Sequence, residues 1–264
     1  AITIPGAVAA WCRLIKDYGN LEVGDVLEPA IDLADNGYVV ADVIADMWRR
    51  EENKLRQDVD ASRIFLNKNN AYKKGEIHKQ KELAETLRSI AKYGRDGFYS
   101  GYVADDMIKK LRKLGGQHSG EDFISFEAEY VEPININYKG YNIYECPPNG
   151  QGIVALMMFN MLSKLDLKKY DPDDFRRIHL EAEVTKLAFL HRNKYLGDPS
   201  FSNIPIKKML SEDYGRELLK NISETSVIKN ININKLDNNK DTVYISAVDN
   251  EGNFVSFINS IFHP

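Results

Sequence analysis

The 264 residues carry a formal net charge of -4 at pH 7, and 28% of them are charged, a composition typical of an ordinary globular protein. This balance gives no electrostatic reason for binding nucleic acid or a membrane surface. Cys12 and Cys146 lie far apart in sequence, and two cysteines make neither a disulfide framework nor a zinc motif, so they do not indicate the cellular compartment. No apolar run is long enough to predict a membrane segment, and no targeting leader is recognisable.

The first two thirds of the chain have the pattern of a mainly helical protein. Pro29 is placed to open a short helix and Gly37 to end it in a left-handed conformation. The stretch VADDMIKKLRKLGG, residues 103–116, is predicted to be a helix that stops at its two glycines, with one apolar stripe made by Val103, Met107, Leu111 and Leu114. Ser119, followed three residues later by Asp122, predicts a capping box for the next short helix.

The hydrophobic period then changes from helical to alternating. Residues 134–138 and 141–143 alternate apolar and polar side chains, and Lys139 and Gly140 between them allow a tight turn. The pattern predicts a β-hairpin near residues 130–146. The turn PNGQG that follows lacks the ending of a phosphate-binding loop, and the unbroken apolar run behind it suits a buried helix.

A long helix is predicted in FRRIHLEAEVTKLAFLHRNKYLGDP, with Ile178, Ala182 and Thr185 on its inner side together with Ala188 or Phe189.

The histidines of this helix raise the question of a metal site. His179 and Glu183 are four residues apart and share a face, but His191 lies about a third of a turn off that face. The spacing and the missing HExxH order argue against a metal site.

From about Asn221 the composition shifts to Asn, Lys, Ser and isolated Ile, which predicts a flexible linker over residues 221–241. A strongly alternating strand begins directly afterwards, at Thr242. A turn with the sequence DNEG follows, and residues 254–259 are predicted to return antiparallel.

A threonine at this junction has one special chemical use. A hydroxyl is a poor nucleophile at neutral pH, but the first residue of a chain can use its own α-amine, with a pKa of about 7.7 to 8.0, as the base. That chemistry requires cleavage between Asp241 and Thr242: the hydroxyl attacks the Asp241 carbonyl, and water resolves the ester. On spacing and composition alone, the simpler interpretation is a β-branched residue that begins a strand.

Resemblance to a known family favours the interpretation of this threonine as a nucleophile. DTVYISAVDNEGNFVSFINSIFHP resembles the start of the small subunit in the γ-glutamyltranspeptidase family of N-terminal-nucleophile (Ntn) hydrolases. Segments of the large subunit resemble, in the same order, IPGAVAAW, LEPAIDLADNGY, GRDGFYSGYVADDMI, LGGQHSGEDF, YECPPNGQG and HLEAEVTKLAFLHRNKYLGDP. The likeness covers essentially the whole chain.

The resemblance implies an α+β fold, the four-layer αββα Ntn-hydrolase sandwich, of which this chain represents only a part. It assigns residues 1–220 to a mainly helical large-subunit region, residues 221–241 to the linker that ends at the processing site, and residues 242–264 to the start of the small subunit. It also implies that the chain begins after the arginine that binds the substrate carboxylate and stops before the oxyanion hole. Loss of an oxyanion donor lowers rates in hydrolases by roughly a hundredfold to a thousandfold, so we expect the fragment alone to be feeble or inert.

The resemblance also implies roles for individual residues. Thr242 matches the nucleophile, Asp241 contributes the scissile carbonyl, and Ser260 matches the hydroxyl that supports the nucleophile. Two residues further on, transpeptidases have an asparagine that holds the substrate's α-amino group, whereas this sequence has Phe262. Asn259 is nearby but in a different register. An apolar ring cannot replace that hydrogen bond, which favours the branch of the family with amidohydrolases and acylases of other substrates.

Two hypotheses of different classes follow. The first is a self-cleaving acyltransferase or amidohydrolase precursor that acts on a small-molecule amide or γ-glutamyl substrate. It needs the remaining small-subunit segment, and it needs no metal or organic cofactor because the α-amine is the base. The second is a non-catalytic relative that keeps the sandwich for binding or scaffolding.

Overall fold

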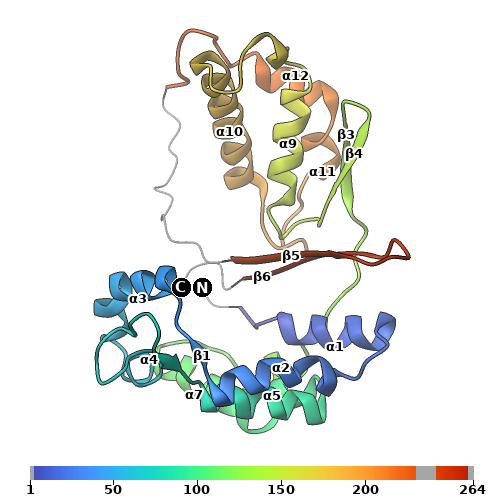
Figure 1. Cartoon of the computed structure of the whole chain (residues 1–264). Helices are drawn as coiled ribbons and strands as arrows, with labels where there is room; N and C mark the ends of the chain where they lie inside the picture. Colours follow the sequence, from blue (N-terminus) through green and yellow to red (C-terminus); the bar gives the residue numbers. More distant parts are fainter. Residues whose placement is uncertain (1–2, 230–241, 261–264) are drawn as a thin grey trace. The chain divides into compact units, whose positions relative to one another are not determined.

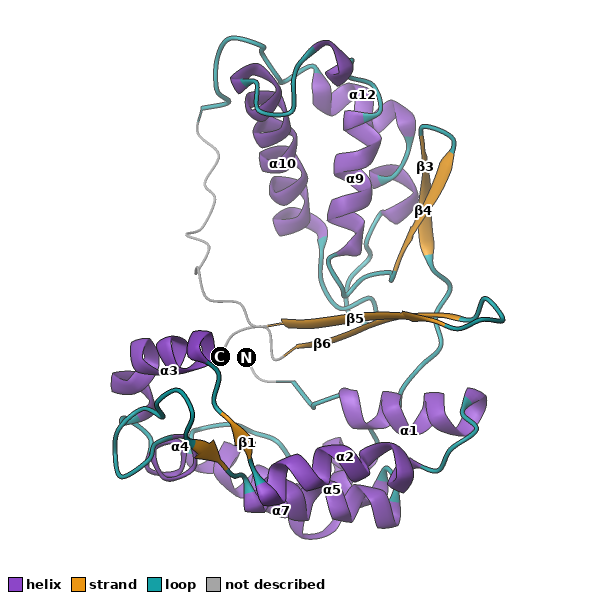
Figure 2. Ribbon diagram, viewed as in Figure 1, coloured by secondary structure: helices purple, strands orange, loops and turns teal. Residues whose placement is uncertain are grey.

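The computed structural model describes residues 3–229 and 242–260. The chain divides into two compact units, Ala1–Glu129 and Tyr130–Pro264 (Figures 1 and 2).

The first unit is helical, with one short antiparallel strand pair. Its elements are α1 (Ala7–Tyr18), α2 (Val23–Asn36), β1 (Tyr38–Val39), α3 (Asp42–Leu55), α4 (Val59–Phe65), β2 (Ile77–His78), α5 (Lys81–Tyr93), α6 (Asp96–Tyr99), α7 (Gly101–Lys113) and α8 (Gly120–Ile124).

Helix α2 is longer than the sequence pattern predicts. It begins at Val23 behind a capping box between Glu22 and Asp25, so Pro29 lies inside it rather than at its first position. An interior proline removes one N–H from the helix ladder, and here its ring lies on the exposed side. The helix ends at Gly37 as predicted. Gly37 has φ 90° but an extended ψ of 168°, outside the left-handed helical region that was predicted.

The core of the first unit lies between α2 and α5, which run side by side in Figure 1. Leu87 and Ile90 of α5 are buried, and so are Tyr99 and Phe123, which contribute the largest rings of the cluster. Each such side chain contributes about 1.5–3 kcal/mol when fully buried.

Helices α7 and α8 agree with the sequence prediction except at one position. Val103 is buried in the core, and the capping box between Ser119 and Asp122 is present. Leu114, predicted to continue the apolar stripe, follows the last residue of α7 and is 66% exposed. The buried residues of α7 are Val103, Ala104 and Ile108. Leu114 does not join them, because the helix ends at Lys113, just before the two glycines.

The second unit combines strand pairs with a helical layer. Its elements are β3 (Ile134–Tyr138), β4 (Tyr141–Glu145), α9 (Gly152–Leu162), the 3₁₀ helix η1 (Leu167–Lys169), α10 (Phe175–Tyr195), α11 (Ile206–Met209), α12 (Glu212–Leu219), β5 (Thr242–Val248) and β6 (Phe254–Ser260).

The β3–β4 hairpin confirms the predicted change of period. Tyr138 pairs with Tyr141 across the turn, and both turn residues, Lys139 and Gly140, have positive φ, at 51° and 90°. Two positive φ values in a two-residue loop match the right-handed twist of the strands.

Helices α9 and α10 form the core of the second unit, and they lie side by side in Figure 1. Helix α9 is apolar almost all round, which is typical of a buried helix. The inner face of α10 is made by Leu180, Glu183, Val184, Leu187 and Ala188.

The predicted inner face of α10 was therefore wrong at three positions. Ile178 is 53% exposed, Ala182 is exposed, and Thr185 is only half-buried, with its hydroxyl donating to the Glu181 carbonyl. Ala188 is buried as predicted. The buried stripe contains the carboxylate of Glu183, and a charged residue breaks the apolar pattern on which the prediction relied.

The predicted linker lies partly outside the described residues, which stop at Lys229 and resume at Thr242. Its first part follows α12 without a regular element, and Ile222 and Ile228 pack against the core of the second unit.

Candidate active site

The predicted C-terminal hairpin is formed by β5 and β6. The strands pair antiparallel from Thr242 opposite Ser260 to Val248 opposite Phe254, which confirms the alternation of faces read from the sequence. Thr242, Tyr244 and Ser246 share one face, and the hydroxyl of Tyr244 lies 3.0 Å from Ser256 Oγ on the same face.

The turn that joins the strands is held by one carboxylate. Asp249 Oδ1 accepts hydrogen bonds from the backbone N–H groups of Glu251 and Asn253, both at 2.9 Å. Asp249 Oδ2 accepts a third from Asn253 Nδ2, at 2.7 Å. The hydrogen bond from the Asn253 side chain is the main reason that the pKa of Asp249 lies below its usual value. Gly252, with φ 86°, completes a turn whose role is structural.

Thr242 and Ser260 are the two predicted site residues that the structure brings together. They are direct partners at the end of the hairpin away from the turn, so the register puts them on the same face. Asp241 and Phe262, the other two predicted site residues, lie outside the described residues.

The register also fixes the position of Asn259. It pairs with Val243, so it lies on the face opposite to Ser260. Asn259 therefore cannot take the place of the asparagine that the family has two residues after Ser260 without a slip of the strand.

Both faces of the hairpin are apolar and exposed. Val243 is 58% exposed on one face and Val248 71% on the other, and further exposed apolar residues are Tyr244, Ile245, Phe254, Val255 and Ile258. An isolated two-stranded hairpin is marginally stable in water. Apolar residues on both faces are typical of strands in an internal layer, covered on each side.

The histidines considered for a metal are engaged elsewhere. His179 Nε2 lies 2.8 Å from the Ser223 carbonyl, and His191 Nδ1 lies 2.7 Å from the Tyr214 hydroxyl. In the part of the chain that the structure describes, no three His, Cys, Asp or Glu side chains gather as metal ligands would. Over the same residues, no helix has both the length and the apolarity needed to cross a membrane.

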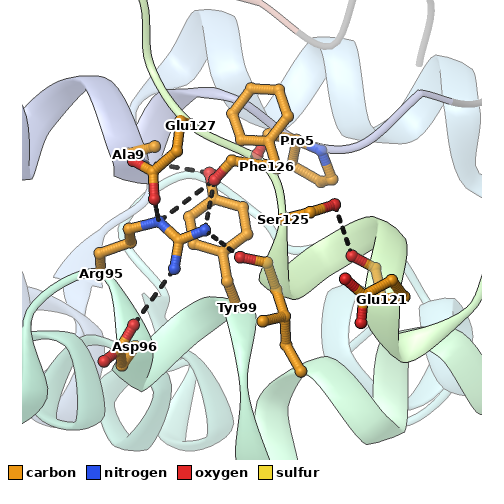
Figure 3. A network of polar contacts seen from close by, with 10 residues as sticks. Pro5, Ala9, Arg95, Asp96, Tyr99, Glu121, Ser125, Phe126 and Glu127 are labelled. Carbon is orange, nitrogen blue, oxygen red and sulfur yellow. Dashed lines mark hydrogen bonds and ion pairs between the residues drawn. The ribbon is translucent and has the colours of Figure 1, made fainter.

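A polar network in the first unit was missed by the sequence reasoning (Figure 3). The guanidinium of Arg95 donates to the carbonyls of Ile124, at 2.6 Å, and Phe126, and it lies 5.0 Å from the ring centre of Tyr99. The Tyr99 hydroxyl donates to the Pro5 carbonyl and accepts from the N–H of Ala9, and burial raises the pKa of this phenol. These contacts tie the start of α1 to the end of α8, which is a structural role.

The sequence model of the gamma-glutamyltranspeptidase family matches residues 1–264. The chain belongs to the gamma-glutamyltranspeptidase family.

Two curated relatives illustrate the range of this gamma-glutamyltranspeptidase family. The chain is 36% identical to a glutathione hydrolase-like proenzyme of Bacillus subtilis, over 99% of this chain and 49% of that protein. It is 32% identical to the capsule biosynthesis protein CapD proenzyme of Bacillus anthracis, over 98% of this chain and 46% of that protein. The chain thus spans about half the length of the curated relatives it matches.

Solved structures of the family show the same fold. Cephalosporin acylase from Bacillus halodurans has a TM-score of 0.85 at 35% identity, over 98% of this chain and 48% of that one. The gamma-glutamyltranspeptidase of Helicobacter pylori has a TM-score of 0.80 at 28% identity, over 89% of this chain and 69% of that one. The predicted α+β class is confirmed, and the chain is part of a four-layer αββα Ntn-hydrolase sandwich.

Proposed function

We propose that this chain is part of a precursor that cleaves itself between Asp241 and Thr242 and then uses Thr242 as the N-terminal nucleophile of an acyltransferase or amidohydrolase. The observation that carries the proposal is the register of β5 and β6, which makes Thr242 and Ser260 direct partners at the open end of the hairpin. In this assignment, residues 1–220 form the large-subunit region, residues 221–241 the linker, and residues 242–264 the start of the small subunit. The boundary between the two compact units falls inside the proposed large-subunit region.

The chemistry follows from a free N-terminus on Thr242. The Thr242 hydroxyl adds to the carbonyl of an amide substrate while its proton passes to the α-amine. Collapse of the tetrahedral intermediate expels the amine, which takes up that proton, and leaves an acyl ester on Thr242. Water or a second amine then attacks the ester and restores the hydroxyl. Ser260 supports the nucleophile by a hydrogen bond to its oxygen.

The substrate class that we propose is a small-molecule amide, with γ-glutamyl amides as the first group to test. Relatives carry the names glutathione hydrolase-like proenzyme and cephalosporin acylase, and these names refer to different amide substrates. Phe262 stands where transpeptidases have an asparagine, which favours acyl groups without a γ-glutamyl α-amine. No metal or organic cofactor is required in this mechanism.

The proposal also includes a structural partner. The apolar residues on both faces of the β5–β6 hairpin must be covered to form a stable sheet. We assign that cover to the remaining small-subunit segment of the full-length protein together with the helical layers.

Intact mass spectrometry of the full-length protein tests the proposal. The wild type and Thr242→Ala are incubated at neutral pH under conditions where both are folded. The wild type is expected to split at Asp241/Thr242 while Thr242→Ala stays whole, and Thr242→Ser, which keeps a hydroxyl, is expected to split. If the folded wild type also stays whole, a non-catalytic binding or scaffolding role replaces the enzymatic one.

A further inference from the structure

Residues 38–78 of the first unit fold around a small core of their own. Of these residues, all of which the structure describes, none belongs to the buried cluster between α2 and α5 or to the partly buried apolar residues packed against it. Helices α3 and α4 have no fully buried residue, and the buried residues of the segment are Val40, Leu66 and His78. Figure 1 shows α3 and α4 on the far side of β1 from α2 and α5. We call residues 38–78 the flap.

The flap is closed at its neck, where the chain enters and leaves it. Strands β1 and β2 pair there, with Tyr38 opposite His78 and Val39 opposite Ile77. Gly37, just before the flap, packs against the returning strand: a Cβ at this position would lie 2.6 Å from Ile77 Cγ2 and 2.7 Å from the His78 carbonyl oxygen. Only glycine allows so close an approach of two backbones. Because entry and exit are neighbours, the segment can open without pulling the rest of the unit apart.

Exposed ion pairs also tie the flap to the rest of the unit. Lys110 of α7 lies 2.8 Å from both Asp58 and Asp60, and Arg63 pairs with Glu82 of α5. Pairs of exposed side chains contribute little to stability, because water solvates both partners when they separate. The hydrogen bond from Lys110 lowers the pKa of Asp58 to about 2, and that from Arg63 lowers the pKa of Glu82, so both acids keep their charge in mild acid.

His78 is the central side chain of the flap core. Its ring is fully buried and is enclosed by one ring from each part of the flap: Tyr38 of β1, Trp48 of α3, Phe65 of α4 and Tyr72 of the loop before β2. Neither ring nitrogen has a hydrogen-bond partner among the described residues. The ionisable groups that face it are the two phenols, since Trp48 and Phe65 have none.

A proton on His78 therefore meets no acceptor and no counter-charge while the flap is closed. Burial and then Glu76 raise the pKa of Tyr72, so this phenol stays neutral. Burial lowers the pKa of His78, because an imidazolium in the box loses its hydration and gains no partner. Opening the flap hydrates the ring and lets it take up the proton, so acid favours the open form.

We propose that the flap is an acid-responsive switch: when His78 takes up a proton, residues 38–78 open as one unit at the Gly37 neck, while the core between α2 and α5 stays folded. Opening exposes the aromatic rings around His78 as an apolar surface. The inference concerns the first unit alone and does not depend on the proposed function.

The size of the response follows from the ordinary pKa of histidine. Below pH 6.5 the open form gains a proton, so the opening equilibrium rises by up to about tenfold per pH unit. From pH 7.5 to pH 5.5, amides of the flap should therefore exchange up to about tenfold faster, after correction for their intrinsic pH dependence. Amides of α5 should keep their corrected rates, because the core to which they belong stays folded.

Hydrogen–deuterium exchange on the full-length protein measures this difference. All samples carry Thr242→Ala, so that every sample has the same chain. We expect the acid response in peptides from residues 42–76 and none in peptides from α5. His78→Phe, which fills a similar space and cannot titrate, should keep the flap closed at both pH values. His118→Gln, which removes a histidine outside the flap, should retain the response.

Gly37→Ala tests the neck without changing any titrating group. The added Cβ clashes with Ile77 and with the His78 carbonyl, so the flap should open at pH 7.5 as well, while α5 amides stay protected. Gly94→Ala is the matched control. Gly94 also has a positive φ, of 60°, but a Cβ there would meet nothing within 4 Å, so exchange of residues 42–76 should not change.

Two results would overturn the proposal. Equal acceleration of flap and α5 amides, in acid or in Gly37→Ala, would show that the first unit opens as a whole. A pH response that survives in His78→Phe, or no response in the protein that retains His78, would remove His78 as the switch. If His78→Phe unfolds the whole unit, the comparison of Gly37→Ala with Gly94→Ala still decides whether the flap opens by itself.

Discussion

Thr242 and Ser260 are the last partners of the β5–β6 pair, at the end away from the Asp249 turn. Substitution of Ser260 by Ala is expected to slow self-cleavage roughly 10- to 100-fold, because in the proposed mechanism it removes one hydrogen bond to an oxygen that gains charge in the reaction. The measurement is the first-order rate of fragment appearance in intact mass spectra of the full-length protein.

The hairpin offers a matched control for that prediction. Ser256 lies on the same face of β6 as Ser260, two pairs further toward the turn than Ile258, and its hydroxyl contacts Tyr244. Ser256→Ala should cleave at the wild-type rate, and Ser260→Thr, which retains a hydroxyl, should cleave faster than Ser260→Ala. Equal rates in Ser260→Ala and the wild type would remove Ser260 from the proposed machinery.

Asp249 is predicted to control the order of the turn. Asp249→Ala removes the acceptor of three hydrogen bonds, so we expect exchange of the Glu251 and Asn253 amides to speed roughly tenfold. Asp249→Asn keeps one acceptor oxygen, so its exchange rates at these amides should lie between those of the wild type and those of Asp249→Ala.

The pH dependence of the same turn has a definite sign. The pKa of Asp249 is lowered in the folded protein, so its contribution to stability is present above the unfolded value of about 3.9 and is lost as the pH falls below it. Amide exchange at the turn, corrected for its intrinsic pH dependence, should therefore rise on acidification in the wild type and stay flat in Asp249→Ala. An identical profile in both proteins would contradict this assignment.

Much of the local structure follows from the sequence where one short-range rule dominates. The Lys139–Gly140 turn and the capping box at Ser119 each depend on a few adjacent residues, and each was predicted correctly. Alternation predicted the two strands of the C-terminal hairpin, whereas the pairing of Thr242 with Ser260 was not predicted and is set by the number of residues around the Asp249 turn.

The failure at α10 has a physical cause in tertiary contact. The inner face of α10 contains Glu183, and an acid is buried there only because Lys186 and a backbone N–H 45 residues away satisfy it. No local pattern reveals such a partner. The early start of α2 has a local cause instead, a capping box upstream of Pro29 that the proline signal concealed. The chemistry of Thr242 could not be read from composition at all, and it became a hypothesis only through family resemblance.

Arg95 is expected to matter for stability although it is remote in sequence from the proposed nucleophile. Its side chain is 20% exposed and serves two carbonyls, at Ile124 and Phe126, above the ring of Tyr99 (Figure 3). Arg95→Lys cannot reproduce the planar fork, so we expect a loss of about 1–3 kcal/mol in the unfolding free energy of the first unit. This loss is measured by a urea titration in which hydrogen exchange of peptides from α5 and α8 reports unfolding. Arg63→Lys, an exposed arginine paired with Glu82, is the control and should leave the titration midpoint in place.

His78 provides the last prediction, a loss of stability of the first unit in mild acid. The ring is fully buried among the aromatic rings of Tyr38, Trp48, Phe65 and Tyr72, with the Trp48 centre at 4.8 Å and the Tyr72 centre at 4.7 Å. Neither ring nitrogen has a hydrogen-bond partner among the described residues. Burial therefore lowers the pKa of His78, because the charged imidazolium loses its hydration and gains no acceptor.

The sign follows from which state binds the proton. The unfolded chain titrates this histidine near pH 6.5, whereas the folded protein keeps it neutral to lower pH, so the unfolded state binds more protons just below pH 6.5. Below pH 6.5, the contribution of His78 should lower the unfolding free energy by up to about 1.4 kcal/mol per pH unit. Above pH 6.5, this contribution should be constant. Urea midpoints from exchange of peptides covering residues 72–78, taken at pH 5 and pH 7.5, measure the difference. His78→Phe, which fills a similar space without titrating, should remove it. His118→Gln, at a less buried position in the same unit, should retain it. A pH dependence that survives in His78→Phe would assign the acid sensitivity of this unit to other groups.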